Sequence, residues 1–188
     1  MKYKNLFLGL MAVIIWLVVY VILPKTDLKT DKLIITKASP GYYFVSKVYD
    51  GDTIAVNMDG REEKVRMIGV DTPETHKPNS PVECYGQQAS EYTTKMLAGK
   101  EVKLEPDPLN QNRDRYQRLL RYIYTKDGQL YNAELIKQGY GFAYLSFPFT
   151  KAEEFRQLQT EARTNNAGLW AGDCTISDQN GRNKTNQL

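Results

Sequence analysis

The sequence predicts an α+β fold built on a closed barrel of five strands with about three helices. Three strand-like segments joined by short turns come first, two more follow farther along, and stretches with helical spacing lie between and after them. An open sheet of five strands would leave two exposed edges, whereas a closed barrel leaves none. We therefore expect a single domain of about 130 residues to close into a barrel.

The five predicted strands share alternating or continuously apolar patterns bounded by turn residues. They are residues 42–50, 53–58, 63–70, 101–106 and 118–125. The dipeptide Asp59-Gly60 is a strong turn signal between the second strand and the third, so these two strands are expected to pair. A polar loop with two prolines, residues 106–117, precedes the fifth strand.

The three predicted helices are residues 85–98, 130–138 and 151–166. In the first, Ala89, Tyr92 and Met96 recur at helical spacing, and Gly99 is a typical helix stop. The last helix carries one apolar stripe, which consists of Ala152, Phe155, Leu158 and Ala162. The commonest small five-stranded barrel is the OB-fold, whose strand surface is a known platform for nucleic acids.

The N-terminus differs in composition from the rest of the chain. Residues 6–23 carry no charge, and a helix of that length spans roughly 27 Å, close to the apolar thickness of a bilayer. No cleavage site of small residues follows, which favours an uncleaved transmembrane signal anchor over secretion after cleavage. The predicted organisation is an anchor at 1–24, a tether at 25–40, the folded domain at 41–172 and a polar, disordered tail at 173–188.

Charge and cysteine content narrow the class of protein. The net charge of +3 at pH 7 permits a nucleic-acid partner without requiring one. Cys84 and Cys174 are the only cysteines, and neither lies in a CxxC or Cys/His metal pattern. With an export-like N-terminus they favour one disulfide, worth at most about 4–5 kcal/mol, over two buried thiols. A disulfide favours the extracellular face of the cell membrane for the domain.

Acidic and basic residues gather at the ends of predicted strands. Asp52 begins the second strand and Asp71 ends the third, so both carboxylates are expected at one end of the barrel. Adjacent carboxylates repel each other unless a cation lies between them. A site of oxygen ligands alone favours a hard ion such as Ca²⁺ or Mg²⁺ over zinc. Taken singly, each motif also fits an ordinary turn or a surface ion pair.

Residues 42–172 resemble the staphylococcal nuclease (thermonuclease) family in uninterrupted order. The resemblance is carried by VYDGDT at 48–53, VRMIGVDTPET at 65–75, YGQQAS at 85–90, DRYQRLLRYIY at 114–124, AELIKQG at 133–139 and GLW at 168–170. DGDT alone is a weak signal, but its combination with R-x-x-x-V-D-T-P-E-T and D-x-Y-x-R is strong. The resemblance implies an OB-fold phosphodiesterase that uses Ca²⁺ to cleave DNA and RNA.

The resemblance implies three metal ligands. Asp52 and Asp71 would bind Ca²⁺ through their carboxylates, and Thr72 would bind it through its backbone carbonyl. A metal held by only three protein ligands keeps coordination positions for water and substrate. Its affinity is expected in the weak range of extracellular sites, ~10⁻⁴–10⁻³ M.

Three catalytic residues are implied as well, Arg66, Glu74 and Arg118. Glu74 would be the general base or would orient the attacking water, and the two arginines would bind the phosphate. In-line attack places negative charge on the equatorial oxygens and on the leaving 5′-oxygen, where cations stabilise the transition state more than the ground state. Departure of the 5′-oxygen would leave 3′-phosphate ends.

The implied substrate-binding residues depart from the family pattern in places. Arg115 and Tyr116 match a Lys-Tyr pair that contacts the terminal phosphate of a bound nucleotide, and Tyr144 matches a tyrosine of the nucleotide pocket. Ser146 stands where the family has a second tyrosine, which implies weaker or altered base stacking. Gln117 replaces a glycine before the second phosphate-binding arginine, which implies a small shift of that loop.

Two functions from different classes are compatible with the sequence. The first is a membrane-tethered, calcium-dependent endonuclease with DNA and RNA as substrates and no obligate protein partner. The alternative is a non-catalytic nucleic-acid-binding OB module, although such modules are expected to have lost the carboxylates that this chain keeps. A calcium- or lipid-binding adaptor at the membrane is a third, more distant reading. His76, the only histidine, is expected to be a solvated loop residue without a catalytic role.

Overall fold

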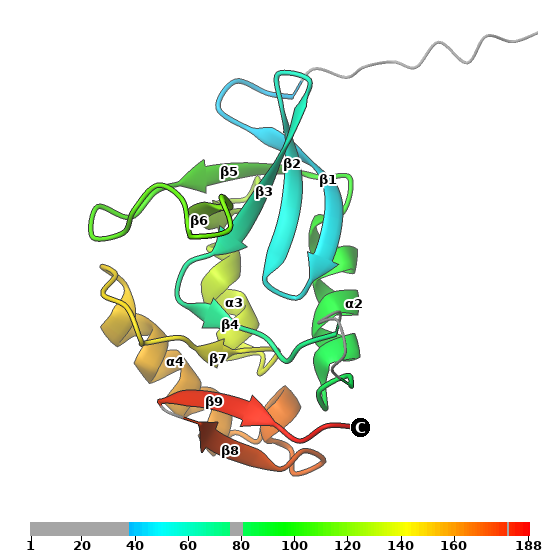
Figure 1. The fold of residues 1–188 in the computed structure, drawn as a ribbon, viewed down its shortest axis with the longest axis vertical. Helices are drawn as coiled ribbons and strands as arrows, with labels where there is room; N and C mark the ends of the chain where they lie inside the picture. Colours follow the sequence, from blue (N-terminus) through cyan, green and yellow to red (C-terminus); the bar gives the residue numbers. More distant parts are fainter. Residues whose placement is uncertain (1–37, 76–80, 180) are drawn as a thin grey trace, which may run out of the picture. The chain divides into compact units, whose positions relative to one another are not determined.

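Five strands close into a barrel in the computed structural model of the chain (Figure 1). The structure describes residues 38–75, 81–179 and 181–188, all within one unit of the chain. The barrel strands are β1 (Tyr43–Asp50), β2 (Thr53–Met58), β3 (Arg61–Met67), β5 (Glu101–Glu105) and β6 (Leu119–Tyr124). They follow the order β1-β2-β3-β6-β5 around the barrel. The α+β class and the five-stranded OB barrel are confirmed.

Three helices pack against the barrel, as predicted. They are α2 (Gly86–Leu97), α3 (Tyr131–Lys137) and α4 (Ala152–Thr164), followed by a short 3₁₀ turn, η1 (Gly168–Trp170). The periodic face of α2 buries Ala89, Thr93 and Leu97, and α2 contacts β1. Phe155 of α4 is fully buried in the same core as the barrel residues Ile54 and Val65. Burial of this apolar face fixes each helix to the barrel.

The strand register brings two of the motifs together. In the antiparallel pair β2–β3, Thr53 lies opposite Arg66. On its other side β3 pairs in parallel with β6, where Arg66 is the partner of Leu120. The residue before β2, Asp52, therefore lies beside Arg66, although the two are 14 positions apart in the sequence.

The third strand ends earlier than predicted. β3 stops at Met67, and the chain turns at Gly69, whose φ of 73° is in the left-handed region. A Cβ at Gly69 would lie 2.7 Å from the Phe149 ring, so close packing also requires glycine there. After this turn a separate two-residue strand, β4 (Val70–Asp71), pairs with β7 (Phe142–Ala143). Asp71 is therefore carried by β4 and not by the end of β3.

The C-terminal tail is ordered, and the prediction of disorder for residues 173–188 was wrong. Strands β8 (Ile176–Gln179) and β9 (Arg182–Thr185) form an antiparallel hairpin, shown in red and brown beneath β4 and β7 in Figure 1. We call this segment the C-terminal hairpin. Polar composition alone predicts disorder because it supplies little apolar area to bury.

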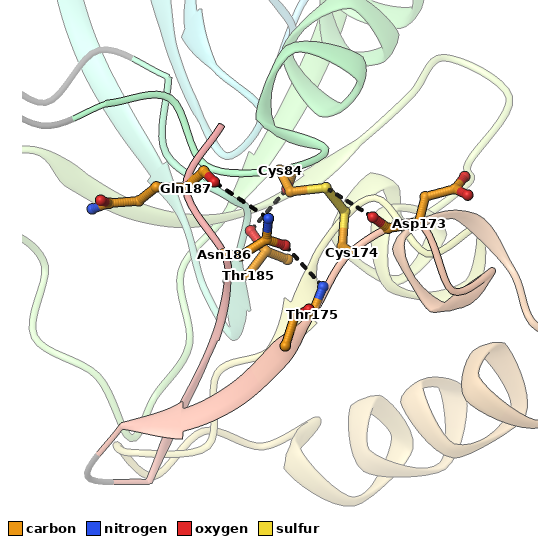
Figure 2. Close-up of a disulfide and its surroundings, with 7 residues drawn as sticks. All are labelled: Cys84, Asp173, Cys174, Thr175, Thr185, Asn186 and Gln187. Carbon is orange, nitrogen blue, oxygen red and sulfur yellow. Dashed lines mark hydrogen bonds between the residues drawn. A yellow bond between two sulfur atoms is a disulfide. The ribbon is translucent and has the colours of Figure 1, made fainter.

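A covalent bond and local hydrogen bonds order the C-terminal hairpin (Figure 2). Cys84 and Cys174 form a disulfide with an S–S distance of 2.02 Å, the pairing that the cysteine content favoured. The N–H of Cys84 donates to the carbonyl of Asn186 at 2.7 Å, and the hydroxyl of Thr185 donates to the carbonyl of Cys84 at 2.8 Å. These contacts join the tail to the segment that precedes α2.

The predicted signal anchor at 1–24 and most of the tether lie outside the described residues, as does His76. Within the ranges that the structure describes, no helix is long and apolar enough to cross a membrane.

Candidate active site

Asp52 and Asp71 meet around one guanidinium group. Nη2 of Arg66 lies 3.0 Å from Oδ2 of Asp52 and 3.0 Å from Oδ1 of Asp71. Both carboxylates are buried. Since one nitrogen atom contacts both acids, the two predicted metal ligands lie within a side chain's reach of each other.

The backbone around the β3–β4 turn fixes Arg66. Its Nη1 donates to the carbonyl of Met67 at 3.0 Å and to that of Val70 at 2.6 Å. Only 13% of the Arg66 side chain is exposed. In this arrangement both terminal nitrogens of Arg66 bond within the chain, so its first role is to hold the turn and balance the carboxylates.

Asp52 is oriented by the two threonines of the motifs. The Thr72 N–H donates to Oδ2 of Asp52 at 2.8 Å, and the Thr53 hydroxyl donates to Oδ1 at 3.0 Å. This approach depends on Gly51, because a Cβ there would lie 2.7 Å from the Thr72 side chain. The glycine of DGDT is thus needed for close contact between the first motif and the second.

Asp50 belongs to the same cluster and was missed by the sequence reasoning. Burial, followed by the charge of Asp52, raises the pKa of Asp50 to about 8, although the charge of Arg66 opposes the shift. The Asp52 N–H donates to Oδ1 of Asp50 at 3.2 Å. The available signal was the motif itself, since DGDT carries two aspartates across one glycine in a tight turn between β1 and β2.

Arg182 is a second residue that the sequence did not indicate. Its Nε donates to Oδ2 of Asp71 at 2.5 Å and its Nη2 to Oδ1 at 2.6 Å. Burial still raises the pKa of Asp71 even though Arg182 and Arg66 both lower it. The contact spans 111 positions and comes from a segment expected to be disordered, so no local pattern could reveal it.

Arg118 joins the cluster from the loop before β6. Its Nε donates to Oδ2 of Asp114 at 2.7 Å, and its backbone N–H donates to Oδ1 at 2.9 Å. Burial acts to raise the pKa of Asp114, but these bonds lower it. Nη1 of Arg118 lies 3.4 Å from Oγ1 of Thr53, the same hydroxyl that donates to Asp52. Asp114 therefore positions Arg118 at the edge of the carboxylate cluster.

Gln117 shows how the chain accommodates the departure beside Arg118. Its φ of 65° lies in the left-handed region, where glycine is favoured. Its N–H and its carbonyl are both bonded, to the carbonyl of Asp114 at 3.0 Å and to Nη1 of Arg113 at 2.7 Å. The loop keeps a glycine-like turn with a glutamine in it, and these two bonds hold that turn.

The predicted substrate-binding residues lie around Arg118 and Asp71. Tyr116 is 65% exposed, and its ring lies 4.8 Å from the Arg115 guanidinium and 5.4 Å from that of Arg118. The Tyr144 ring lies 5.6 Å from Arg182, the partner of Asp71. Two aromatic faces thus flank the cluster, each beside a guanidinium group.

Glu74 follows Thr72 by two residues and is held through its backbone by Glu83. The Glu74 N–H donates to Oε2 of Glu83 at 3.1 Å, and the Glu83 N–H donates to the carbonyl of Glu74 at 2.9 Å. Oε1 of Glu74 accepts the Thr75 N–H at 3.0 Å. Lys184 of the C-terminal hairpin lies 3.2 Å from Oε1 of Glu83. The segment carrying Glu74 is therefore held by Glu83, three residues before α2, and Glu83 is in turn bonded to the hairpin.

The donor set fits a hard cation in its chemistry. Asp50, Asp52 and Asp71 offer only oxygen atoms, and burial, with the charge of Asp52 added, raises the pKa of Asp50 and of Asp71 although Arg66 opposes both shifts. Among the described residues, no three Asp, Glu, His or Cys side chains form a ready cage for a metal.

Comparison with known proteins places these residues in a family. The model of the staphylococcal nuclease homologue family matches residues 64–172, more than half of the chain. The thermonuclease of Staphylococcus hyicus is 41% identical over 138 residues, which cover 73% of this chain and 80% of that protein. The thermonuclease of Staphylococcus intermedius is 43% identical over 129 residues, covering 68% and 75%.

A more distant bacterial relative gives the same result. The endonuclease YncB of Bacillus subtilis is 39% identical over 137 residues, which cover 72% of this chain and 64% of that protein. The barrel, the two motifs gathered around Arg66 and these matches lead to one assignment: the chain belongs to the staphylococcal nuclease family.

Proposed function

We propose that this protein is a calcium-dependent endonuclease that hydrolyses phosphodiester bonds of DNA and RNA and leaves 3′-phosphate ends. The observation that carries the proposal is the sharing of Arg66 Nη2 by Asp52 and Asp71, at 3.0 Å from each. Two buried acids and a guanidinium in contact suit the binding of a cation and a phosphate side by side.

The enzyme class follows from the relatives. Proteins named thermonuclease or endonuclease match this chain at 36–43% identity, and the family model covers both the second motif and Arg118. The chain is therefore a hydrolase, an endonuclease of the thermonuclease type. Calcium, the direction of bond cleavage and the individual residue roles go beyond that class and belong to the proposal.

Asp52, Asp71 and the backbone carbonyl of Thr72 would hold the Ca²⁺. Bound there, the ion would supply positive charge beside the phosphate as negative charge develops on its oxygens. The Thr72 N–H already holds Asp52 at 2.8 Å, so one of the acids is oriented in advance. Such preorganisation reduces the rearrangement needed when substrate binds.

Arg118 and Arg66 would bind the phosphate oxygens. Asp114 holds Arg118 through both Nε and Nη2, each 2.7 Å from Oδ2, and Nη1 is directed to the Thr53 hydroxyl beside the carboxylate cluster. A planar fork can donate to two phosphate oxygens at once, which an ammonium group cannot do. When Ca²⁺ balances the two carboxylates, Nη2 of Arg66 would donate to the phosphate in place of one of them.

Glu74 would accept a proton from the attacking water or orient it. Its backbone is bonded on both sides to Glu83, so the carboxylate is carried by a fixed segment two residues from Thr72. General base catalysis of this kind contributes typically ~10²–10⁴-fold. Arg115, Tyr116 and Tyr144 would bind the flanking phosphate and bases.

The test is cleavage of single-stranded DNA and of RNA by the full chain in detergent, with Ca²⁺ and with chelator. We expect cleavage only with Ca²⁺, internal cuts, and new ends that become extendable only after phosphatase treatment. Equal cleavage in chelator would contradict the metal requirement. Tight binding without cleavage in either condition would instead favour the non-catalytic nucleic-acid-binding module.

We also propose that the domain works outside the cell, held by the N-terminal anchor. The Cys84–Cys174 disulfide supports an oxidising compartment. Protease added to intact cells should release the domain while leaving cytosolic markers untouched. If the protein were instead recovered from the medium with its chain beginning near residue 24, secretion after cleavage would be favoured.

A further inference from the structure

We propose that the C-terminal hairpin carries a built-in competitor for the metal site, in which Arg182 occupies Asp71 and raises the Ca²⁺ concentration that the enzyme needs. This inference rests on the proposed function, because it assigns a controlling residue to the same site. It concerns a segment beyond residue 172, where the match to the family model ends.

Asp71 is the point of contact between Arg182 and the metal site. Arg182 donates to both carboxylate oxygens, from Nε to Oδ2 at 2.5 Å and from Nη2 to Oδ1 at 2.6 Å. Two parallel charge-assisted bonds of this kind are among the strongest polar contacts in proteins. A Ca²⁺ ion coordinated by Asp71 would use the same oxygen atoms. Binding of the ion therefore requires Arg182 to leave or to share them.

Of the two cations on Asp71, Arg182 is the replaceable one. The Arg66 side chain is 13% exposed and is bonded to two backbone carbonyls, whereas that of Arg182 is 45% exposed. A half-exposed guanidinium that turns away gains bonds to water, and a bound Ca²⁺ would then balance the buried Asp71 in its place. Displacing Arg66 would instead leave buried carbonyls without donors.

Arg182 also lies at the predicted nucleotide pocket. Its guanidinium lies 5.6 Å from the ring centre of Tyr144. A side chain that bridges Asp71 and Tyr144 stands between the predicted metal ligand and the predicted nucleotide pocket. Displacement by Ca²⁺ would therefore expose the Tyr144 face at the same time.

The disulfide keeps the competitor close. Cys174 precedes β8 by two residues and is bonded to Cys84, while Lys184 contacts Glu83 at 3.2 Å (Figure 2 shows the disulfide). A tethered group competes at an effective concentration in the millimolar range for short links, far above that of a free guanidinium. Loosening the tether should weaken the competition without removing Arg182.

The test is Ca²⁺ binding to the full chain in detergent, measured by calorimetry without substrate. Arg182→Gln should lower the Kd for Ca²⁺ about tenfold. The Kd of Arg182→Lys should lie between those of Arg182→Gln and wild type, because an ammonium group is a point charge and cannot bind both oxygens of Asp71 as the guanidinium does. Arg156→Gln is the matched control, since Arg156 is an exposed arginine paired with Glu153 on α4. Its Kd should equal that of wild type.

A second variant tests the tether. The double variant Cys84→Ser, Cys174→Ser should lower the Kd for Ca²⁺ by a smaller factor than Arg182→Gln does. When Arg182→Gln is added to the double variant, the Kd should fall no further than in Arg182→Gln alone. Circular dichroism and thermal unfolding of each variant in chelator report whether it folds. Full additivity of the two changes would overturn the role of the tether.

The outcomes separate this inference from the proposed function. Equal Kd values for wild type and Arg182→Gln, with binding lost in Asp52→Asn, would overturn the competition and leave the metal site intact. No Ca²⁺ binding in any of the three would overturn the metal and the competition together. An unchanged Kd for Ca²⁺ with a higher KM for DNA would make Arg182 a substrate contact and would also overturn the competition.

Discussion

The pKa of Asp107, on one side, and the pKa values of Asp50 and Asp71, at the barrel end, are shifted in opposite directions. Asp107 is 3% exposed and accepts four bonds, from the Tyr122 hydroxyl at 2.7 Å, the Thr150 N–H at 2.8 Å, the Thr150 hydroxyl at 2.5 Å and the Leu109 N–H at 2.8 Å. Burial acts to raise its pKa, but these bonds lower it to about 2. Asp107 joins the 106–117 loop to β6 and to the start of α4.

The acids at the barrel end show the reverse. Burial raises the pKa of Asp50 and of Asp71, and the charge of Asp52 adds to both shifts. Arg66 and Arg182 reduce the pKa of Asp71 without restoring its ordinary value. The difference teaches that a single carboxylate which stabilises the fold is surrounded by donors, whereas the site gathers several buried acids whose charges repel one another even with Arg66 and Arg182 beside them. Such a site gains from a cation.

The largest expected effect that separates the two regions is on catalysis. Glu74→Gln removes the proposed base but keeps the size of the side chain, so kcat should fall about 10³–10⁴-fold. The Kd for single-stranded DNA should change by less than about threefold. Single-turnover cleavage and fluorescence anisotropy measure the two quantities. A near-native rate would remove Glu74 from the mechanism.

Arg118→Lys should have the next largest effect. A point charge cannot keep the bond to Asp114 and also present two donors to a phosphate, so kcat/KM should fall about 10²–10³-fold. Arg163→Lys, at an exposed arginine on α4, is a matched control that should leave the rate unchanged. If both substitutions had equal effects, the fork of Arg118 would have no special role.

Asp107→Asn should affect the fold and not the chemistry. The amide keeps the shape of the side chain, but its NH₂ group would face at least one of the donors that now bond to the carboxylate. The free energy of unfolding should therefore fall by about 2–3 kcal/mol. Urea denaturation measures this change. The rate of DNA cleavage per folded molecule should match that of wild type, and a rate loss beyond the folded fraction would contradict the division into two regions.

The pH dependence of stability sharpens the same contrast. The pKa of Asp107 is lowered to about 2 from 3.8, so its ionised form is favoured by folding. Its contribution is fully present above about pH 4 and is lost as the pH falls towards 2, by about 1–2 kcal/mol. The Asp107→Asn variant should lack this component, so its stability curve should converge on that of wild type at low pH.

Asp50→Asn should give the smallest effect and the opposite sign. The pKa of Asp50 is raised to about 8, so folding favours the neutral form; that stability is present below about pH 4 and is lost as the pH rises through 8. In chelator at pH 8, the variant should be more stable than wild type by about 1 kcal/mol, with no gain at pH 4. Urea titrations at the two pH values measure both. A loss of stability at pH 8 would mean that positive charge within the fold balances the Asp50 carboxylate.

Much of the barrel and its helices was predictable from the sequence, because period and turn chemistry are local properties. The alternation in β1, the Asp59-Gly60 turn and the spacing of Ala89, Tyr92 and Met96 each depend on residues within one element. The conjunction of DGDT with VDTPE also indicated that two acids meet at one barrel end, because β2 and β3 are joined by a short turn.

Tertiary structure decided the rest, because the deciding contacts join residues far apart in the chain. β3 ends at Met67 since Gly69 must pass close to the Phe149 ring, 80 positions away. The C-terminal hairpin is ordered by Cys84, and it delivers Arg182 to Asp71 across 111 positions. Composition describes the tail only as polar, and the ion pair has no local signature, although the two cysteines had favoured the disulfide. The sequence by itself determined the barrel strands, the three helices and which acids face each other; long-range packing determined the C-terminal hairpin and which cations meet those acids.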